Sequence, residues 1–221
     1  AGYKVVTIKD SVVLHKMGSN AKPVNTFINY YMWRNRIHFF MKYTPEEKLD
    51  HMSYCILSSA FDAMYESMYR EEHNIMQTIS YAYYDAIRDV RGKASDGKIR
   101  NNDASDSRFQ SYLQTKKTYY LKADTTEEEQ EAQAFIEALQ TECQRVEQES
   151  DADVTIVVCP YIMRCKREQY PEKNQIVLDS YKNVILDESD WEAVSQYDYA
   201  KSLFIYMNQG AFLEATKALR K

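Results

Sequence analysis

The strongest match to a chemical motif in this 221-residue chain is to a phosphate-binding loop. Gly92, Gly97 and Lys98 reproduce the GxxxxGK spacing, in which backbone amides and a lysine hold the phosphates of a nucleotide. The next residue of such a loop is Ser or Thr, which binds magnesium, and a strand precedes the loop. Here the next residue is Ile99 and a helix is expected before Gly92. The sequence therefore argues against a nucleotide site, and no GxGxxG dinucleotide fingerprint occurs.

Metal ligands and reactive thiols are the next candidates. His51 and Cys55 are four residues apart and share a face of a helix, but two ligands do not make a metal site and HExxH is absent. We expect a partly buried histidine beside a small apolar cysteine. Cys159 and Cys165 are six residues apart, which is not the CxxC spacing of redox proteins, so core packing is expected ahead of thiol chemistry. We expect no metal and no cofactor.

Acid–base and nucleophilic chemistry have weak support. Glu71, Glu72 and His73 could form an acid–base cluster at a helix bend, although exposed polar residues are common at such bends. The sequence contains no GxSxG nucleophile elbow. We therefore expect no enzymatic activity, and keep as a third hypothesis an enzyme of unrecognised class built around His51, Cys55 and His73.

A nucleic-acid contact is the alternative that the aromatic and basic residues suggest. Trp33, Arg34, Arg36 and Lys42 interleave a stacking ring with cations on a stretch, 24–43, whose apolar spacing predicts a helix. The whole chain has a net charge of −5, which works against attraction to a phosphate backbone. The plainer interpretation is the cationic flank of an amphipathic helix.

The longest predicted element, and the one that organises the rest, is a helix over residues 44–91. Thr44 as N-cap, Pro45 at the first helical position and Glu47 form a start signal, and apolar residues recur at helical spacing as far as Val90. A polar dip at 71–74 marks where the helix could bend or break. One apolar face is rich in Met and Ile and the other in Tyr and Phe, which predicts packing between neighbours.

Shorter elements complete the expected fold. Capping boxes at Thr126 and Ser189 predict two more helices, and Gly210 is expected to end the second. The β-branched run 154–159 predicts a strand, 176–178 and 184–186 a hairpin, and 112–121 a short strand or helix. We therefore expect a mainly α fold, a helical bundle around the long two-faced helix with a small β element (α+β). It forms a single domain, 1–221, with an N-terminal strand arm (1–17), a polar loop (92–108), the small β element (154–187) and a C-terminal helical arm (189–221).

Composition limits the class of protein. Five glycines and four prolines are few for a sandwich, propeller or barrel, and nineteen tyrosines supply large contact areas of the kind that protein interfaces use. Four irregularly spaced cysteines suggest reduced thiols in a cytosol-like compartment. No apolar run is long enough for a membrane span, and the first residues lack the apolar core of a secretory signal.

The organisation resembles the ring-forming head–tail adaptor, or connector, proteins of tailed bacteriophages. The run LSSAFDAMYESMYREE, with Leu57, Ala60, Met64, Tyr65 and Arg70, is similar to an early helix of that family. Residues 92–108 and 191–221 then correspond to its long loop and its docking arm. The resemblance implies a ring between portal and tail, with neither enzymatic activity nor a cofactor.

Our first hypothesis is therefore a non-enzymatic structural subunit of a multi-protein assembly, in the specific form of a virion ring or connector protein. Its partners would be further copies and neighbouring assembly proteins, and its location the virion or the host cytoplasm. The alternative is a nucleic-acid-associated accessory protein that uses helix 24–43. The residues expected at the protein interface are Tyr54, Phe61, Tyr65, Tyr69, Trp191, Phe204 and Phe212.

Overall fold

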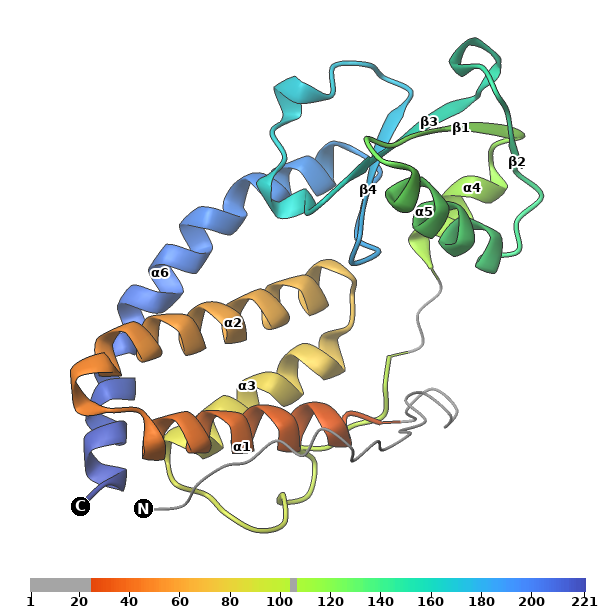
Figure 1. Ribbon diagram of the computed structural model, residues 1–221. Helices are drawn as coiled ribbons and strands as arrows, with labels where there is room; N and C mark the ends of the chain where they lie inside the picture. The colour runs from red at the N-terminus through yellow and green to blue at the C-terminus, as the bar shows by residue number, and fades with distance from the viewer. Residues whose placement is uncertain (1–24, 104–106) are drawn as a thin grey trace, which may run out of the picture.

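The computed structural model describes residues 25–103 and 107–221 and shows a mainly α, α+β fold. Its described part contains six α-helices and one five-stranded sheet. Figure 1 shows the helices α1, α2 and α3 at one end of the molecule, the sheet with α4 and α5 at the other, and α6 running along both. The predicted fold class is confirmed. The N-terminal strand arm predicted at 1–17 lies outside the described residues.

Four helices form the larger core. They pack in the spatial order α1, α3, α2, α6, and the residues they bury most completely include Tyr30, Ile37, Leu57, Tyr83 and Phe212. Each helix contributes apolar residues three and four positions apart, which places them on one face. These helices are α1 (Phe27–Tyr43), α2 (Leu49–Tyr69), α3 (His73–Ile87) and α6 (Glu188–Leu219).

The long helix predicted at 44–91 is two antiparallel helices. Between α2 and α3, Glu71 has a backbone φ of 62°, in the left-handed region, and the Glu72 amide donates to the Ser67 carbonyl at 2.7 Å. The polar dip in the sequence marks this turn. The predicted start is also wrong, because Thr44 and Pro45 precede a 3₁₀ turn, Glu46–Lys48, and α2 begins at Leu49 with no side-chain cap.

The sheet is larger than the predicted element 154–187. Strand order is β2-β1-β3-β4-β5, all parallel except β5, which pairs antiparallel with β4. The strand at 154–159 and the hairpin of 176–178 with 184–186 are confirmed, while 112–121 contains the end of a helix followed by a strand. The elements are α4 (Arg108–Gln114), β1 (Thr118–Lys122), α5 (Thr126–Ala138), β2 (Gln144–Arg145), β3 (Val154–Cys159), β4 (Gln175–Asp179) and β5 (Val184–Ile185).

The two faces of the sheet are covered by different helices, because successive strand residues point to opposite sides. Ile156, Ile176 and Leu178 face α4 and α5. Cys159 and Val177 face the first turns of α6, the end of α2 and the 3₁₀ turn Ile162–Arg164. This second face joins the sheet to the helices, and Phe204 packs against both this cluster and the larger helical core. Further 3₁₀ turns span Glu149–Asp151 and Arg167–Gln169.

Helix ends differ from the predicted ones in three places. The α5 capping box is formed by Thr125 and Glu128, one residue earlier than predicted. The α6 N-cap is Asp187, whose carboxylate accepts from the Ser189 and Asp190 amides. Gly210 lies inside α6, which continues to Leu219 and packs on α2, so residues 189–221 do not form a separate arm. Within 25–103 and 107–221, no helix has the length and hydropathy needed to cross a bilayer.

Candidate functional site

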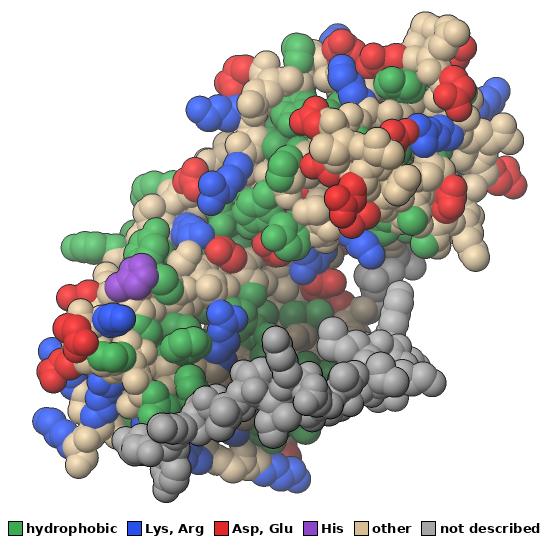
Figure 2. All heavy atoms as spheres, in the orientation of Figure 1, with side chains coloured by type: hydrophobic (Ala, Val, Ile, Leu, Met, Phe, Trp, Pro, Cys, Tyr) green, Lys and Arg blue, Asp and Glu red, His purple; other side chains and the backbone are tan. Residues whose placement is uncertain are grey.

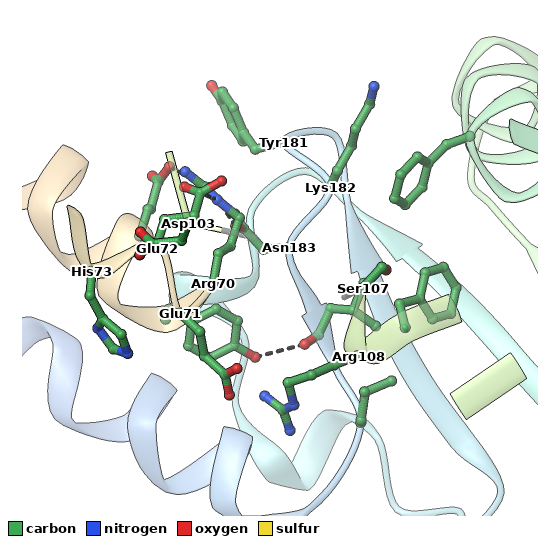
Figure 3. Close-up of a pocket in the computed structure, with 16 residues that line it drawn as sticks. Arg70, Glu71, Glu72, His73, Asp103, Ser107, Arg108, Tyr181, Lys182 and Asn183 are labelled. Carbon is green, nitrogen blue, oxygen red and sulfur yellow. Dashed lines mark hydrogen bonds and ion pairs between the residues drawn. The ribbon is translucent and has the colours of Figure 1, made fainter. Parts of the chain in front are cut away.

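A large cleft lies where the helices meet the sheet. It has a volume of about 920 Å³ and is lined by the turn between α2 and α3, the first residues of α4 and the turn between β4 and β5. Figure 3 shows Arg70, Glu72 and His73 on one side and Lys182 on the other, with Arg108 below them. The cleft therefore carries charges of both signs.

Most of these charges are held in pairs within the chain. The Arg70 guanidinium donates to Glu72 Oε2 at 3.0 Å and to Asn183 Oδ1 at 2.8 Å. Arg108 donates to Asp190 Oδ1 at 2.9 Å, and this hydrogen bond raises the pKa of Arg108. The Arg70–Asn183 bond links the helix turn to the sheet hairpin, and the Arg108–Asp190 bond links α4 to α6. The cleft is therefore a joint between the two parts of the molecule.

The predicted acid–base cluster lies on the wall of this cleft. Glu72 is the ion-pair partner of Arg70, and the Glu71 carboxylate acts electrostatically on Arg108. Among the described residues, no group of three or more His, Cys, Asp or Glu could hold a metal ion.

The middle of the aromatic face of α2, predicted to meet helix 24–43 or a neighbour, is buried within the subunit. Phe61 and Tyr65 are each 8% exposed and pack on α6, and the Tyr65 hydroxyl donates to the Ala193 carbonyl at 2.6 Å. The Tyr69 hydroxyl donates to the Val184 carbonyl at 2.8 Å. The interface prediction is wrong for Phe61 and Tyr65, because α6 covers them, whereas Tyr69 is half-buried and lines the cleft.

The other predicted interface residues divide between interior and surface. Phe212 is fully buried and stacks on Tyr83, which corrects its assignment to an interface. Trp191 and Phe204 are half-buried; Trp191 lies against Tyr170. Tyr54 is exposed, as an interface residue must be.

The predicted nucleic-acid surface is interrupted in the same way. Trp33 and Arg34 are buried, and the Arg34 guanidinium lies 5.1 Å from the centre of the Tyr30 ring. Arg36 and Lys42 remain on the surface. A base cannot stack on a ring that the core already covers, so Trp33 cannot be the platform. Phe39 and Phe40 of the same helix are 58% and 37% exposed, and a nucleic-acid contact through them stays a prediction.

The residues set aside in the motif analysis have identifiable places. Lys98 of the phosphate-loop spacing pairs with Asp85, and its Nζ lies 2.6 Å from both carboxylate oxygens. His51 and Cys55 share a face of α2, with Nε2 and Sγ 3.6 Å apart, and both are exposed, whereas a partly buried histidine was expected. A groove of about 370 Å³ lies between α1 and α2, and we call it the α1–α2 groove. It is lined by Arg36, Phe40, Thr44, Pro45, Lys48, His51, Met52, Cys55, Ile56 and Ser59.

A surface that the sequence analysis missed lies on α6. Tyr199, Leu203, Tyr206 and Met207 are 69%, 43%, 84% and 70% exposed, and their spacing of four, three and one residues places them on one side of the helix. We call this surface, which continues to Gly210, the α6 outer face. Figure 2 shows hydrophobic side chains along the edge where α6 runs, and acidic side chains gathered over α5. Large apolar side chains rarely cluster on a surface without a binding role.

The α6 outer face is also free of charge. Residues 202–213 contain no Asp, Glu, Lys or Arg, and this run is the signal that could have revealed the face from sequence. Lys201, just before the run, is turned inward to Asp62 at 2.8 Å. Burial lowers the pKa of Lys201, but the hydrogen bonds and charge interactions with Asp62 and Tyr197 together outweigh burial and raise it.

Gly210 adds an independent observation to this surface. It lies inside a helix, where glycine costs about 0.5–1 kcal/mol relative to alanine. A Cβ added there would meet no atom within 4 Å, so packing within the subunit does not require glycine. A missing side chain on an exposed helix face does allow another backbone to approach closely.

No protein-family model, curated protein or solved structure matches this chain.

Proposed function

We propose that this protein is a non-enzymatic structural subunit of a multi-protein assembly and that it binds another copy of itself through the α6 outer face. The observation that carries the proposal is the uncharged stretch of α6, on which Tyr206 and Met207 are largely exposed. Aromatic and methionine side chains are enriched at the centres of interfaces, from which charges are depleted. The ring of a virion connector is the specific setting that we propose for it.

A ring requires that one surface of a subunit bind a different surface of the next. The α1–α2 groove is the apolar, concave surface that suits the projecting side chains of α6. Phe40, Pro45 and Met52 supply its apolar wall, and α6 packs on α2 through other residues, among them Phe61 and Tyr65. We therefore propose that the α6 outer face of one copy occupies the α1–α2 groove of the next.

Replacing Tyr206 with glutamate should break this contact. A charge placed in a desolvated interface, with the loss of a large aromatic anchor, is expected to weaken association by at least about 30-fold. Light scattering after size-exclusion chromatography should show assemblies for the wild type at high concentration and monomers for Tyr206→Glu. Tyr181→Glu is the matched control, because Tyr181 is 62% exposed on the turn between β4 and β5. The assemblies of this variant should have the same mass as those of the wild type.

A mixing experiment distinguishes the head-to-tail contact from a symmetric pairing of two α6 helices. Phe40→Glu should block the groove, leaving a monomer with an intact α6 outer face. Mixed with Tyr206→Glu, it should form one-to-one dimers that grow no further, because only one complementary pair of surfaces remains. A wild-type protein that stays monomeric at high concentration would overturn the proposed self-assembly. A Phe40→Glu variant that associates like the wild type would overturn the groove as the partner surface.

Gly210→Ala should change stability and association in opposite directions. The added methyl group meets open space, so helix propensity should raise the free energy of unfolding by about 0.5–1 kcal/mol. The same methyl group should weaken self-association, because it holds the partner's backbone away. Urea unfolding in the monomeric Tyr206→Glu background measures the first effect, and sedimentation of the single variant measures the second. An equal or tighter association of Gly210→Ala would show that the partner does not contact this position.

A further inference from the structure

Cys159 and Cys165 lie side by side although six residues separate them in the sequence. Their Sγ atoms are 3.5 Å apart, and neither forms a disulfide. Cys159 is the last residue of β3 and is buried, whereas Cys165 is half-buried and directly follows the 3₁₀ turn Ile162–Arg164. The sequence spacing did not indicate this pair.

The loop between the two cysteines is held in place by the sheet. The Ile162 amide donates to Asp179 Oδ2 at 3.1 Å, and the Cys165 amide donates to the Ile162 carbonyl at 2.9 Å. Ile162 and Met163 are buried against α6. These contacts fold the loop back on itself. Cys165 therefore lies beside Cys159, at the end of β3.

The surroundings make one thiol more acidic than the other. The hydrogen bond with Cys159, together with one to the Tyr170 hydroxyl 3.5 Å from Cys165 Sγ, lowers the pKa of Cys165 to about 7 against the opposing effect of burial. The same thiol pair and burial raise the pKa of Cys159. Near neutral pH a large fraction of Cys165 is therefore a thiolate, the nucleophilic form of cysteine, and it is the more exposed of the two.

We propose that Cys159 and Cys165 are a redox-active thiol pair, which a hydroperoxide converts to an intramolecular disulfide. The Cys165 thiolate attacks the terminal oxygen of the hydroperoxide, the O–O bond breaks, and the departing alkoxide or hydroxide takes up a proton; Cys165 is now a sulfenic acid. Cys159 sulfur then attacks the Cys165 sulfur, the S–O bond breaks, and the Cys159 proton leaves with hydroxide as water. The dithiol is oxidised by two electrons and the hydroperoxide is reduced.

The movement required is small. The sulfur atoms must approach from 3.5 Å to about 2.05 Å, the length of a disulfide bond. The turn Ile162–Arg164 connects the two residues, so its adjustment can supply this movement without separating the strands. The inference concerns a different part of the molecule from the α6 outer face and does not depend on self-assembly.

Peptide mapping of the wild-type protein tests the proposal. The protein is treated with a small excess of hydrogen peroxide at neutral pH, its free thiols are alkylated, and it is digested with trypsin without reductant. Trypsin cleaves after Arg164, between the two cysteines, so peptide 146–164 remains joined to the dipeptide 165–166 only if the disulfide has formed. We expect this linked species, a loss of two of the four titratable thiols, and full recovery of both after dithiothreitol.

Two variants test whether Cys159 and Cys165 are the cysteines that become oxidised. Cys159→Ser should leave a sulfenic acid at Cys165 that a dimedone probe labels, and it should form no linked peptide. Cys55→Ser removes the exposed cysteine of α2 and should form the linkage as the wild type does. Four thiols that remain titratable, dimers joined through Cys55, or oxidation of Cys165 to sulfinic acid without linkage would each overturn the proposal. The mapping of the wild type is decisive even if a variant fails to fold.

Discussion

Replacing Asp85 with alanine should lower the free energy of unfolding by about 3–5 kcal/mol, the cost of breaking a buried ion pair by removing one partner. Asp85 is buried, and its two oxygens each lie 2.6 Å from Lys98 Nζ. The Tyr30 hydroxyl also donates to it. Burial and the bond to Asp85 raise the pKa of Tyr30 to about 12, so Tyr30 stays a donor at neutral pH. The variant leaves an ammonium group and a hydroxyl without their acceptor.

A double-mutant cycle with Lys98→Met separates this pair from general loss of packing. Urea unfolding should show that the double variant loses much less free energy of unfolding than the two single variants lose together. The reason is that the second change removes the charge that the first left unpaired. Glu188→Ala serves as control, since the Glu188 side chain is 75% exposed, it pairs with Arg167, and a surface ion pair is worth about 0–1 kcal/mol. A cost for Asp85→Ala near that of the control would show that the pair does not hold the fold.

The Asp85–Lys98 pair gives the lysine of the phosphate-loop spacing a structural role. Lys98 lies in the polar segment after α3 and ties that segment to the helices. The Thr26 amide donates to the Arg100 carbonyl at 2.8 Å, and the Ala94 amide donates to the Tyr31 hydroxyl at 3.0 Å. The described part of this loop is therefore held against α1 and α3, and its lysine is occupied within the subunit.

Sequence patterns within a short segment predict the strands and turns that depend on that segment alone. Five of the six residues of the run 154–159 are β-branched and only Thr155 is polar, as expected for a strand buried on both faces, and the run forms β3. The polar dip at 71–74 contains the turn that divides the predicted long helix. The sequence does not decide between strand and helix for β1, because TYYLK alternates only weakly. The place of β1 beside β3 depends on pairing with residues more than thirty positions away. Pairing at that distance leaves no mark on the local pattern.

The interface prediction failed because tyrosine and phenylalanine fit both interior and surface. Tyr65 and Tyr206 look alike in the sequence, yet Tyr65 lies against α6 and Tyr206 on its outer side. The packing position of α6 decides which faces of α2 and of α6 are covered. That position cannot be predicted from a local sequence pattern. The absence of charge over 202–213 was the more informative signal, since an unpaired surface helix face is ordinarily charged.

Phe212→Ala should lower the free energy of unfolding by about 3–5 kcal/mol, the usual cost of removing a buried aromatic ring. Phe212 is fully buried, its ring stacks on Tyr83 with centres 6.5 Å apart, and it belongs to the core shared by α1, α2, α3 and α6. The cavity cannot close easily, because helices on several sides hold its walls. Urea unfolding in the monomeric Tyr206→Glu background measures the cost without a contribution from association.

Comparison with the exposed tyrosine tests the assignment of the two faces of α6. Tyr206→Ala should change the free energy of unfolding by no more than about 0.5 kcal/mol, since Tyr206 is 84% exposed, yet it should weaken association. Phe212→Ala should show the opposite pattern at temperatures where it remains folded, with lower stability and a retained tendency to associate. Because both residues lie on the same helix six positions apart, a general loss of α6 would affect both properties in both variants. Opposite patterns can arise only if one face of α6 belongs to the core and the other to the interface.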